Sequence, residues 1–289
     1  IVTHQHYLYL LFLSGVWGMS FLFLKMIAPT IPPITIAAAR ITIGAIVIAI
    51  YVLSKGEKLP SHKSIWLKGS VIGLIGVGAP FVLISWAMLY INSGTGAIGM
   101  SVIPLMVVIQ RMSLLGFCGI ISGICGVLVL FYDSLNIAQD NDNMAILALI
   151  AMMAASFGYA FSNILIRRHV KTEPIHTSFV MLATASAALW PLAFIFEQPL
   201  AIEYNNFEII SLLYLGILPT GITTMVLVVF TQKAGSIFVS YNTYLIPIFG
   251  VFAGYFFLDE VLKGTTFLSI LFIAGGIYIS QIKTSKLIK

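Results

Sequence analysis

Charged side chains are scarce in this sequence. Only 9% of the 289 residues are charged, 60% are hydrophobic, and the mean hydropathy is +1.04. A soluble domain carries about 25% charged residues, so this chain lacks the polar surface of a soluble monomer. One very large core is the alternative, but the apolar runs recur along the whole chain between short polar breaks. The composition therefore predicts an integral membrane protein.

Cysteines and catalytic motifs are also lacking. Cys118 and Cys125 lie in one apolar run, and on a helix their spacing separates them by roughly 10 Å, too far for a disulfide. The sequence contains no HExxH, GxSxG or GxxxxGK[ST] pattern and no metal-ligand spacing. We therefore expect neither an enzyme nor an ATP-driven pump, and no cofactor or metal.

Acidic residues are missing from the expected membrane interior. All 10 Asp and Glu residues lie in expected loops or at helix ends, and the 5 His residues lie outside the spans. Proton-coupled carriers commonly use a buried carboxylate relay. We therefore expect a uniporter or an exchanger rather than proton coupling through a carboxylate.

Long apolar runs, by contrast, fill the chain. Membrane barrels show alternating rather than continuous apolar residues, so each run is expected to be a helix. The first run lacks the basic flank and cleavage site of a signal peptide and is expected to be a span. The predicted fold class is an all-α integral membrane protein with ten transmembrane helices. The expected spans are 7–29, 33–54, 65–91, 94–110, 114–132, 144–166, 177–196, 208–231, 235–257 and 265–282.

Basic residues follow the alternation of these spans. With the N-terminus in the cytoplasm, the loops and tail on that side hold nearly all Lys and Arg residues, and only Lys263 falls in an outer loop. Most acidic residues lie on the opposite side. Both termini are thus expected to be cytoplasmic, in the inner (cytoplasmic) membrane. Topology accounts for the net charge of +5, so no nucleic-acid partner is needed.

The two halves of the chain repeat one pattern, in which an Ile-Pro pair interrupts an apolar run. Pro104 and Pro247 occupy matching places in residues 1–133 and 144–289. Each half holds five spans, an odd number, so homologous halves have opposite orientations in the membrane. Such inverted repeats are typical of secondary transporters, with the substrate site near the midplane. The two prolines are expected to bend their helices, either at a cavity or only for packing. Pro80 and Pro219 likewise interrupt the third and eighth expected spans.

The first copy of this pattern is short. Gly276 follows Pro247 by 29 positions, whereas Gly126 follows Pro104 by only 22. The shortfall falls at residues 110–111, in "SVIPLMVVIQRMSLLGF". We expect that a stretch is absent there, which would add about 10 Å of helix. A true deletion, which would leave the fourth helix too short to cross, is the alternative.

Several loose patterns complete this picture: "GVWGMSFLFLK", "AAARITIGA", "SWAMLYINSGTGAIGMSVIPL", "SFGYAFSNILIRR" and "LLYLGILPTGITTMVLVVFTQKAGSIFVSYNTYLIPIFGVFAGYFFLDE". Together with the ten spans and the duplicated halves, they resemble the EamA-type transporters of the drug/metabolite transporter superfamily. The resemblance implies a central cavity lined by spans one, three, four, six, eight and nine. It also implies movement of small metabolites, often amino acids and often outward.

Arg40 is the strongest candidate for contact with a substrate. A guanidinium within a span costs about 2.5–3.5 kcal/mol on insertion scales, so Arg40 is expected to face protein or a cavity. A structural role, such as bonding backbone carbonyls, is the alternative. Lys25, near the outer end of the first span, is expected to reach outward to the interface. By analogy with the cavity-lining spans, the other candidates are Trp17, Trp86, Tyr90, Tyr159, Asn163, Thr220, Tyr241, Asn242 and Tyr244.

These observations predict a secondary transporter, whether exporter, uniporter or exchanger, that works by alternating access. Aromatic candidates suit aromatic or cationic solutes, and Arg40 suits a carboxylate. Amino acids or related solutes meet both of these chemical requirements. A flippase for lipid-linked substrates on the same fold is the alternative. The expected partners are a small-molecule substrate and membrane lipid, and GxxxG pairs such as Gly69-Gly73 and Gly250-Gly254 are expected to pack helices within a monomer or a homodimer.

Overall fold

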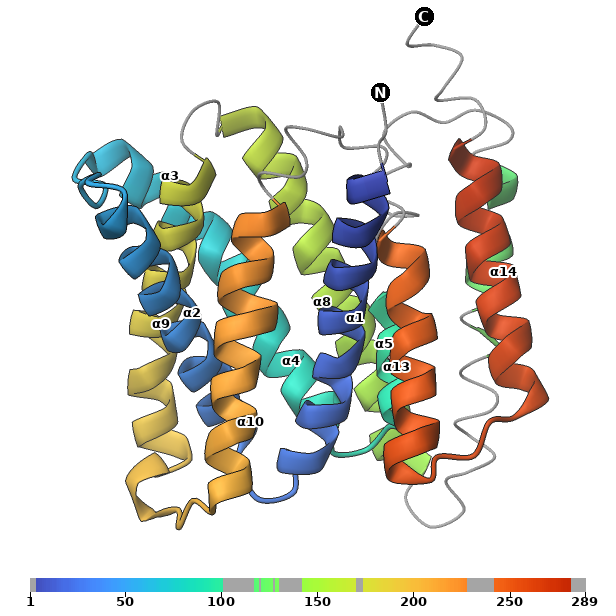
Figure 1. Ribbon diagram of the computed structural model, residues 1–289. Coiled ribbons are helices and arrows are strands. Elements are labelled where there is room, and N and C mark those ends of the chain that lie inside the picture. The colour runs from blue at the N-terminus through green and yellow to red at the C-terminus, as the bar shows by residue number, and fades with distance from the viewer. Residues whose placement is uncertain are drawn as a thin grey trace, which may run out of the picture.

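The computed structural model describes residues 4–100, 117–119, 121–126, 128–129, 142–169, 174–227 and 242–281. Across these ranges the chain is helical and contains no strand (Figure 1). The helices are α1 (His4–Ile27), α2 (Pro33–Ser54), α3 (Lys63–Gly73), η1 (Leu74–Gly78), α4 (Ala79–Ala87), α5 (Ser93–Met100), α8 (Asp142–His169), α9 (Pro174–Phe196), η3 (Pro199–Ala201), α10 (Asn206–Gly216), η4 (Ile217–Ile222), α13 (Asn242–Leu258) and α14 (Gly264–Gln281).

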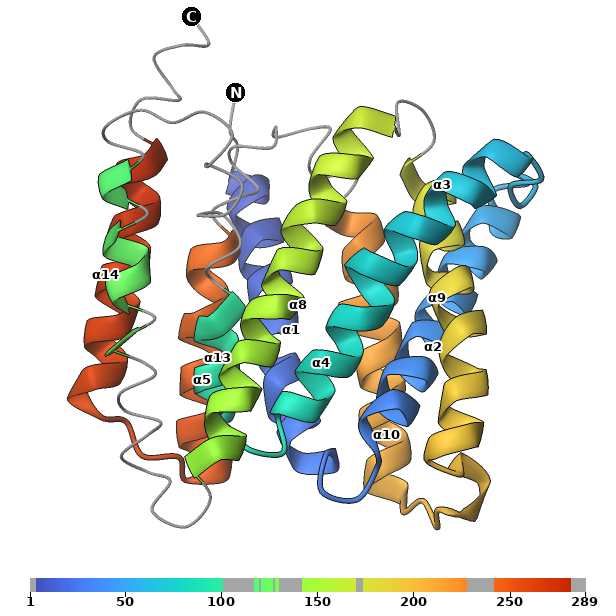
Figure 2. The same ribbon diagram turned by 180° about the vertical axis from the view of Figure 1, so that it is seen from behind.

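The long helices run side by side between two ends of a bundle (Figures 1 and 2). Six described segments are long and apolar enough to cross a membrane, which agrees with a multi-pass membrane protein. The count of ten spans and the inverted repeat stay predictions. Pro104 and the shortfall at 110–111 lie outside the described residues.

The connections between helices define the two ends. At the lower end of Figure 1, α1 turns into α2, α4 into α5, α9 into α10 and α13 into α14. At the upper end α2 turns into α3. Under the predicted topology, the lower end is the outer face and the upper end is the cytoplasmic face.

Two long helices contain a π-helical turn in their middle. η1 separates α3 from α4, with Pro80 two positions after its last residue, and η4 follows α10 and contains Pro219. A proline inside a helix removes one backbone hydrogen bond and clashes with the preceding turn, and a wider turn relieves that clash. Single π-helical turns are frequent at functional sites. The proline interruptions predicted in spans three and eight are therefore found as π turns.

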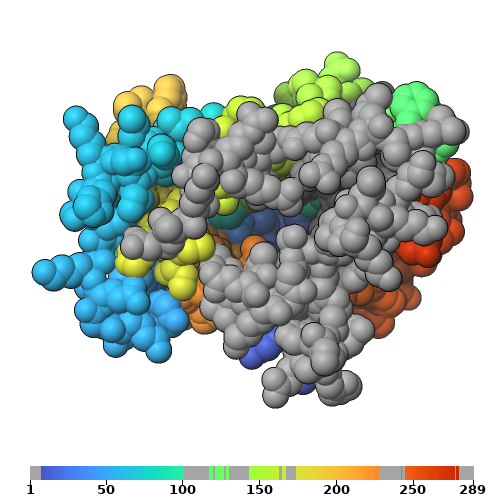
Figure 3. Space-filling model, turned by 90° about the horizontal axis from the view of Figure 1, so that it is seen from above, coloured from blue at the N-terminus to red at the C-terminus, as the bar shows by residue number. Residues whose placement is uncertain are grey.

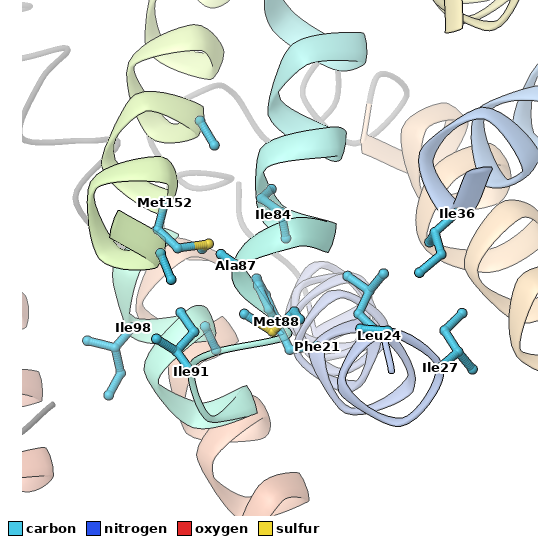
Figure 4. Packing of buried hydrophobic residues seen from close by; sticks show 14 of the residues in the cluster. Phe21, Leu24, Ile27, Ile36, Ile84, Ala87, Met88, Ile91, Ile98 and Met152 are labelled. Atoms are coloured by element: carbon cyan, nitrogen blue, oxygen red, sulfur yellow. The ribbon is translucent and has the colours of Figure 1, made fainter. Parts of the chain in front are cut away.

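Apolar side chains seal the lower half of the bundle. Figure 4 shows Met88 between the end of α4 and the α1 residues Phe21 and Leu24, with Ile91 and Ile98 beside it. These side chains are at most 6% exposed. Even the connecting loops contribute, because Ile31 and Ile91 are buried in the same cluster. The core therefore closes the lower end of the bundle.

Glycines bring the helices close, as the GxxxG pairs predict. A Cβ on Gly73 would collide with the backbone of Met181 in α9, and one on Gly250 with Ala97 in α5. The predicted packing role of these pairs is confirmed within one chain. The two cysteines are free thiols, as expected.

Candidate functional site

Arg40 lies on the inner side of α2, where it is 4% exposed. Its Nε and Nη2 atoms each donate to Thr220 Oγ1 at 3.3 Å. The guanidinium carbon lies 4.1 Å from the centroid of the Phe81 ring, which gives a cation–π contact. Arg40 therefore faces protein, as expected, and joins α2 to η4 and α4.

No carboxylate lies within ion-pair distance of Arg40 among the described residues. The polar groups around it are neutral: besides Thr220, the phenols of Tyr159 and Tyr214 lie close enough to interact with it electrostatically. Buried charges in proteins are normally paired, because removal of an ion from water is costly. An arginine held by hydroxyl and aromatic groups retains donors for an anion.

The π turn η4 determines how Thr220 is presented. Thr220 Oγ1 donates its single proton to Leu215 O, five residues earlier, at 2.7 Å. The lone pairs of that oxygen thus remain for the N–H groups of Arg40. Thr223 Oγ1 donates to Pro219 O at 2.7 Å in the same way. These hydroxyl groups satisfy carbonyls around the interruption, and one of them also holds the guanidinium.

Two aromatic residues connect α1 to this region. Trp17 Nε1 donates to Pro219 O at 2.8 Å, and the Tyr214 hydroxyl donates to Val16 O at 3.2 Å. An indole has only one N–H, so the donor of Trp17 is already used by the protein. The predicted substrate contact of Trp17 is therefore restricted to its ring face, and its hydrogen bond braces η4.

The structure brings together only some of the predicted site residues. Arg40, Thr220 and Tyr159 form one group, with Trp17 at its edge through η4. Trp86 and Tyr90 form a separate aromatic pair with ring centroids 5.1 Å apart.

The remaining candidates belong to α13 or lie outside the description. Asn242 is 4% exposed, and its side-chain amide is hydrogen-bonded to Ser14 Oγ of α1. Pro247 lies inside α13, as expected. Tyr241 and the side chains of Asn163 and Tyr244 lie outside the described residues.

Sequence reasoning missed Phe81 and Tyr214. Phe81 follows Pro80 directly, and Tyr214 lies in the last turns of α10 before η4. Both are therefore next to the helix interruptions, and a search around Pro80 and Pro219 would have found them. Lys25 Nζ donates to Met88 O at 2.9 Å, and its expected reach to the interface stays a prediction.

The upper face of the bundle is hollowed near its centre (Figure 3). Atoms coloured blue, teal and orange, as in α1, α4 and the η4 region, lie at depth in this hollow (Figure 3). The hollow opens at the upper end (Figure 3), whereas the lower end is packed with apolar side chains.

Comparison with known proteins identifies the family. Residues 5–132 and 143–281 match the EamA-like transporter family. The chain belongs to the EamA-like transporter family. Its members are transporters rather than enzymes, in agreement with the lack of catalytic motifs. The match covers nearly the whole chain.

Individual relatives are distant but aligned over most of their length. The uncharacterized transporter YoaV of Bacillus subtilis (strain 168) is 24% identical over 94% of this chain and 94% of its own length. A probable amino-acid metabolite efflux pump of Escherichia coli (strain K12) is 27% identical over 92% of this chain and 91% of its own. A protein of known crystal structure aligns over 99% of both chains with a TM-score of 0.69 at 19% identity, which supports the fold alone.

Proposed function

We propose that this protein is a secondary transporter of small metabolites, amino acids or related solutes, that works by alternating access in the inner membrane. The observation that carries the proposal is Arg40, a buried cation whose partners among the described residues are neutral. A substrate carboxylate would pair with the guanidinium in a bidentate manner. The aromatic rings of Phe81, Tyr159 and Tyr214 nearby suit an apolar side chain.

Two further observations support the proposal. The efflux pump of Escherichia coli is named for amino-acid metabolites, and an exporter would load its substrate from the cytoplasmic side, where the hollow opens under the predicted topology. The two stretches that match the family also coincide closely with the proposed halves 1–133 and 144–289. A duplicated chain of this kind would place its substrate between the halves, where α2 of the first half meets η4 of the second.

A thermal-stability screen of the detergent-purified protein tests this function. The ligands are amino acids, each paired with the amine that lacks its carboxylate. A ligand that binds only the folded protein at 100 times its dissociation constant stabilises it by about 2.7 kcal/mol. We expect saturable increases in melting temperature with amino acids and none with the matched amines.

Flux measurements in liposomes then separate the alternatives. Counterflow of the stabilising amino acid would support transport. If no soluble solute of any class raises the melting temperature or moves across the liposome membrane, the metabolite proposal is wrong. Lipid-linked substrates would then be tested, because a flippase on the same fold would bind through the lipid-facing side.

A further inference from the structure

Two glutamates that follow helices of the second half cap helices of the first half. Glu197 lies directly after α9, and Glu260 lies two residues after α13. Their carboxylates bind the N-termini of α2 and α5, respectively. All four helix ends lie at the lower end of the bundle (Figure 1).

The contact of Glu197 with α2 uses three donors. Ile34 N donates to one carboxylate oxygen at 2.9 Å, and Thr35 N and Oγ1 donate to the other at 2.7 and 2.8 Å. The residue before α2 is Pro32, whose side chain gives no cap. Because the first N–H groups of a helix have no partner within the helix, Glu197 takes the place of the missing N-cap.

The contact of Glu260 with α5 has the same form. Ser93 N donates to one carboxylate oxygen at 2.7 Å and Gly94 N to the other at 3.2 Å. Lys25 of α1 lies close enough to Glu260 for electrostatic attraction. Gly254 makes this approach possible, because a Cβ there would collide with the carboxylate. Glu260 therefore joins α13 to α5, with α1 at its side.

The backbone beside each glutamate is in an unusual conformation. Among the described residues other than glycine, only Gln198 and Asp259 have positive φ, at 48° and 51°. Gln198 follows Glu197, and Asp259 precedes Glu260. A left-handed residue other than glycine is unfavourable by about 1 kcal/mol or more and persists where surrounding contacts hold it. Each carboxylate thus lies next to a left-handed residue whose conformation is held by the surrounding contacts.

The upper end has a weaker counterpart. Glu57 follows α2 and lies 3.4 Å from His176 in the first turn of α9, but the Glu57 side chain is 57% exposed. Exposed ion pairs contribute little, since water and salt screen them. The lower end is therefore held by half-buried carboxylates that each accept several hydrogen bonds. Among the described residues, the Glu57–His176 ion pair at the upper end is more exposed, and that end is hollowed (Figure 3).

We propose that Glu197 and Glu260 are two latches that keep the lower end closed by tying the second half of the chain to the first. Opening of the lower end separates each carboxylate from its helix N-terminus. This role rests on the alternating access proposed above. It assigns the closed state to interactions at the lower end and not to the substrate site around Arg40.

Distances between spin labels at the lower end test the latches. The labels are placed on Thr30→Cys and Leu200→Cys, which are exposed positions on opposite sides of the Glu197 contact, in a Cys118→Ser, Cys125→Ser background. We expect Glu197→Gln to raise the ratio of long to short distances about tenfold, because it removes hydrogen bonds to a charged acceptor. A second pair, Thr30→Cys with Val261→Cys, reports on Glu260→Gln in the same way.

Glu203→Gln is the matched control. Glu203 is exposed at the same end, and among the described residues it caps no helix, so the same loss of charge is expected to leave both distances unchanged. If Glu197→Gln reduces folding, Thr35→Val removes only the hydroxyl donor to Glu197. It is expected to produce a smaller shift in the same direction.

The outcomes distinguish the latches from the transport mechanism. A folded Glu197→Gln variant with the distance distribution of Glu203→Gln would overturn the latch proposal while leaving alternating access intact. A third pair, Lys58→Cys with Tyr278→Cys, lies at the upper end and is measured with and without a stabilising amino acid. If no pair at either end ever shows a second population, both the latches and alternating access are wrong.

Discussion

The two π turns, η1 and η4, occupy comparable places in the two halves but have different surroundings. η1 packs against α8 and α9, and η4 packs against α1 and α2. In a duplicated chain these are equivalent neighbours, namely the first two helices of the opposite half. η1 is made only of apolar residues and glycine, and Gly76 lies against Ser162 of α8. η4 carries Thr220, and Gly44 of α2 leaves space for it.

The comparison shows that a similar π-helical interruption permits close packing at η1 and binds polar side chains at η4. At η1 small residues permit close packing, since a Cβ on Gly158 of α8 would collide with Ile75 O and with Pro80. At η4 the hydroxyl of Thr220 and the carbonyl of Pro219 are each bound by a side chain from the other half. The polar site is therefore asymmetric, although the backbone pattern is shared.

Replacement of Arg40 tests the η4 side of the comparison and has the largest expected effect. Arg40→Gln removes the charge beside Thr220 and Phe81. Hydrogen bonds to charged groups contribute about 1.5–3 kcal/mol, so we expect the dissociation constant of a stabilising amino acid to rise about 10- to 150-fold. The measurement is ligand titration of the melting temperature.

Two controls accompany this variant. Arg40→Lys retains the charge but not the planar fork and is expected to lose less affinity. Lys68→Gln removes a charge from the exposed upper end and is expected to bind as the unchanged protein does. A folded Arg40→Gln protein with unchanged affinity would show that Arg40 has only a structural role.

Removal of the Thr220 hydroxyl is expected to have an intermediate effect. Thr220→Val keeps the shape of the side chain but removes the hydroxyl acceptor of Arg40 in η4, so the guanidinium loses its orientation. A hydrogen bond contributes about 1 kcal/mol, which corresponds to a fivefold weaker affinity. Affinity is measured by the same titration.

Ser162→Ala is the matched change at η1. Ser162 is 3% exposed and lies against Gly76. Loss of its hydroxyl is expected to leave ligand affinity unchanged. Equal losses of affinity in Thr220→Val and Ser162→Ala would contradict the asymmetry between the two π turns.

The smallest expected effect concerns Trp17, which braces η4. Trp17→Phe keeps an aromatic ring but removes the donor to Pro219 O, and a hydrogen bond contributes about 0.5–1.5 kcal/mol. We expect the melting temperature to fall by about 1–5 °C, with ligand affinity within about twofold of the original protein.

Trp66→Phe provides the comparison for this effect. Its indole also donates to a prolyl carbonyl, Pro60 O, at 2.8 Å, but at the upper end and away from η4. There water replaces the lost partner, so the decrease in melting temperature is expected to be smaller. A large loss of affinity in Trp17→Phe without loss of stability would instead place Trp17 in direct contact with the substrate.

Much of the fold could be predicted from the sequence, because a lipid environment restricts the possible backbone structures. Buried backbone groups in lipid must bond internally, so long apolar runs predict helices. Residues 33–54 were predicted as a span, and α2 covers this range. The π turns were not predicted, because wider and regular helical turns have the same apolar composition. Pro80 and Pro219 indicated only that the helices are interrupted.

The residues of the candidate site could be predicted only in part from the sequence. Arg40 was identified because a charge within an apolar span is costly and needs a protein environment. Tyr159 and Thr220 were named by analogy and do lie beside it, but Trp86 was also named and lies in a separate aromatic pair. Phe81 and Tyr214 were missed because their apolar rings look like ordinary lipid-facing or core residues.

By itself, the sequence determined the environment of this chain, its helical class and the place of Arg40 within an apolar span, because hydrophobicity and charge are properties of single residues. Only the tertiary structure decided that Thr220 holds Arg40, that Trp17 braces η4, and that Glu197 caps a helix 162 positions away. Such pairings depend on which helices pack together and at what height. Helical periodicity does not encode that information, because it describes one helix at a time.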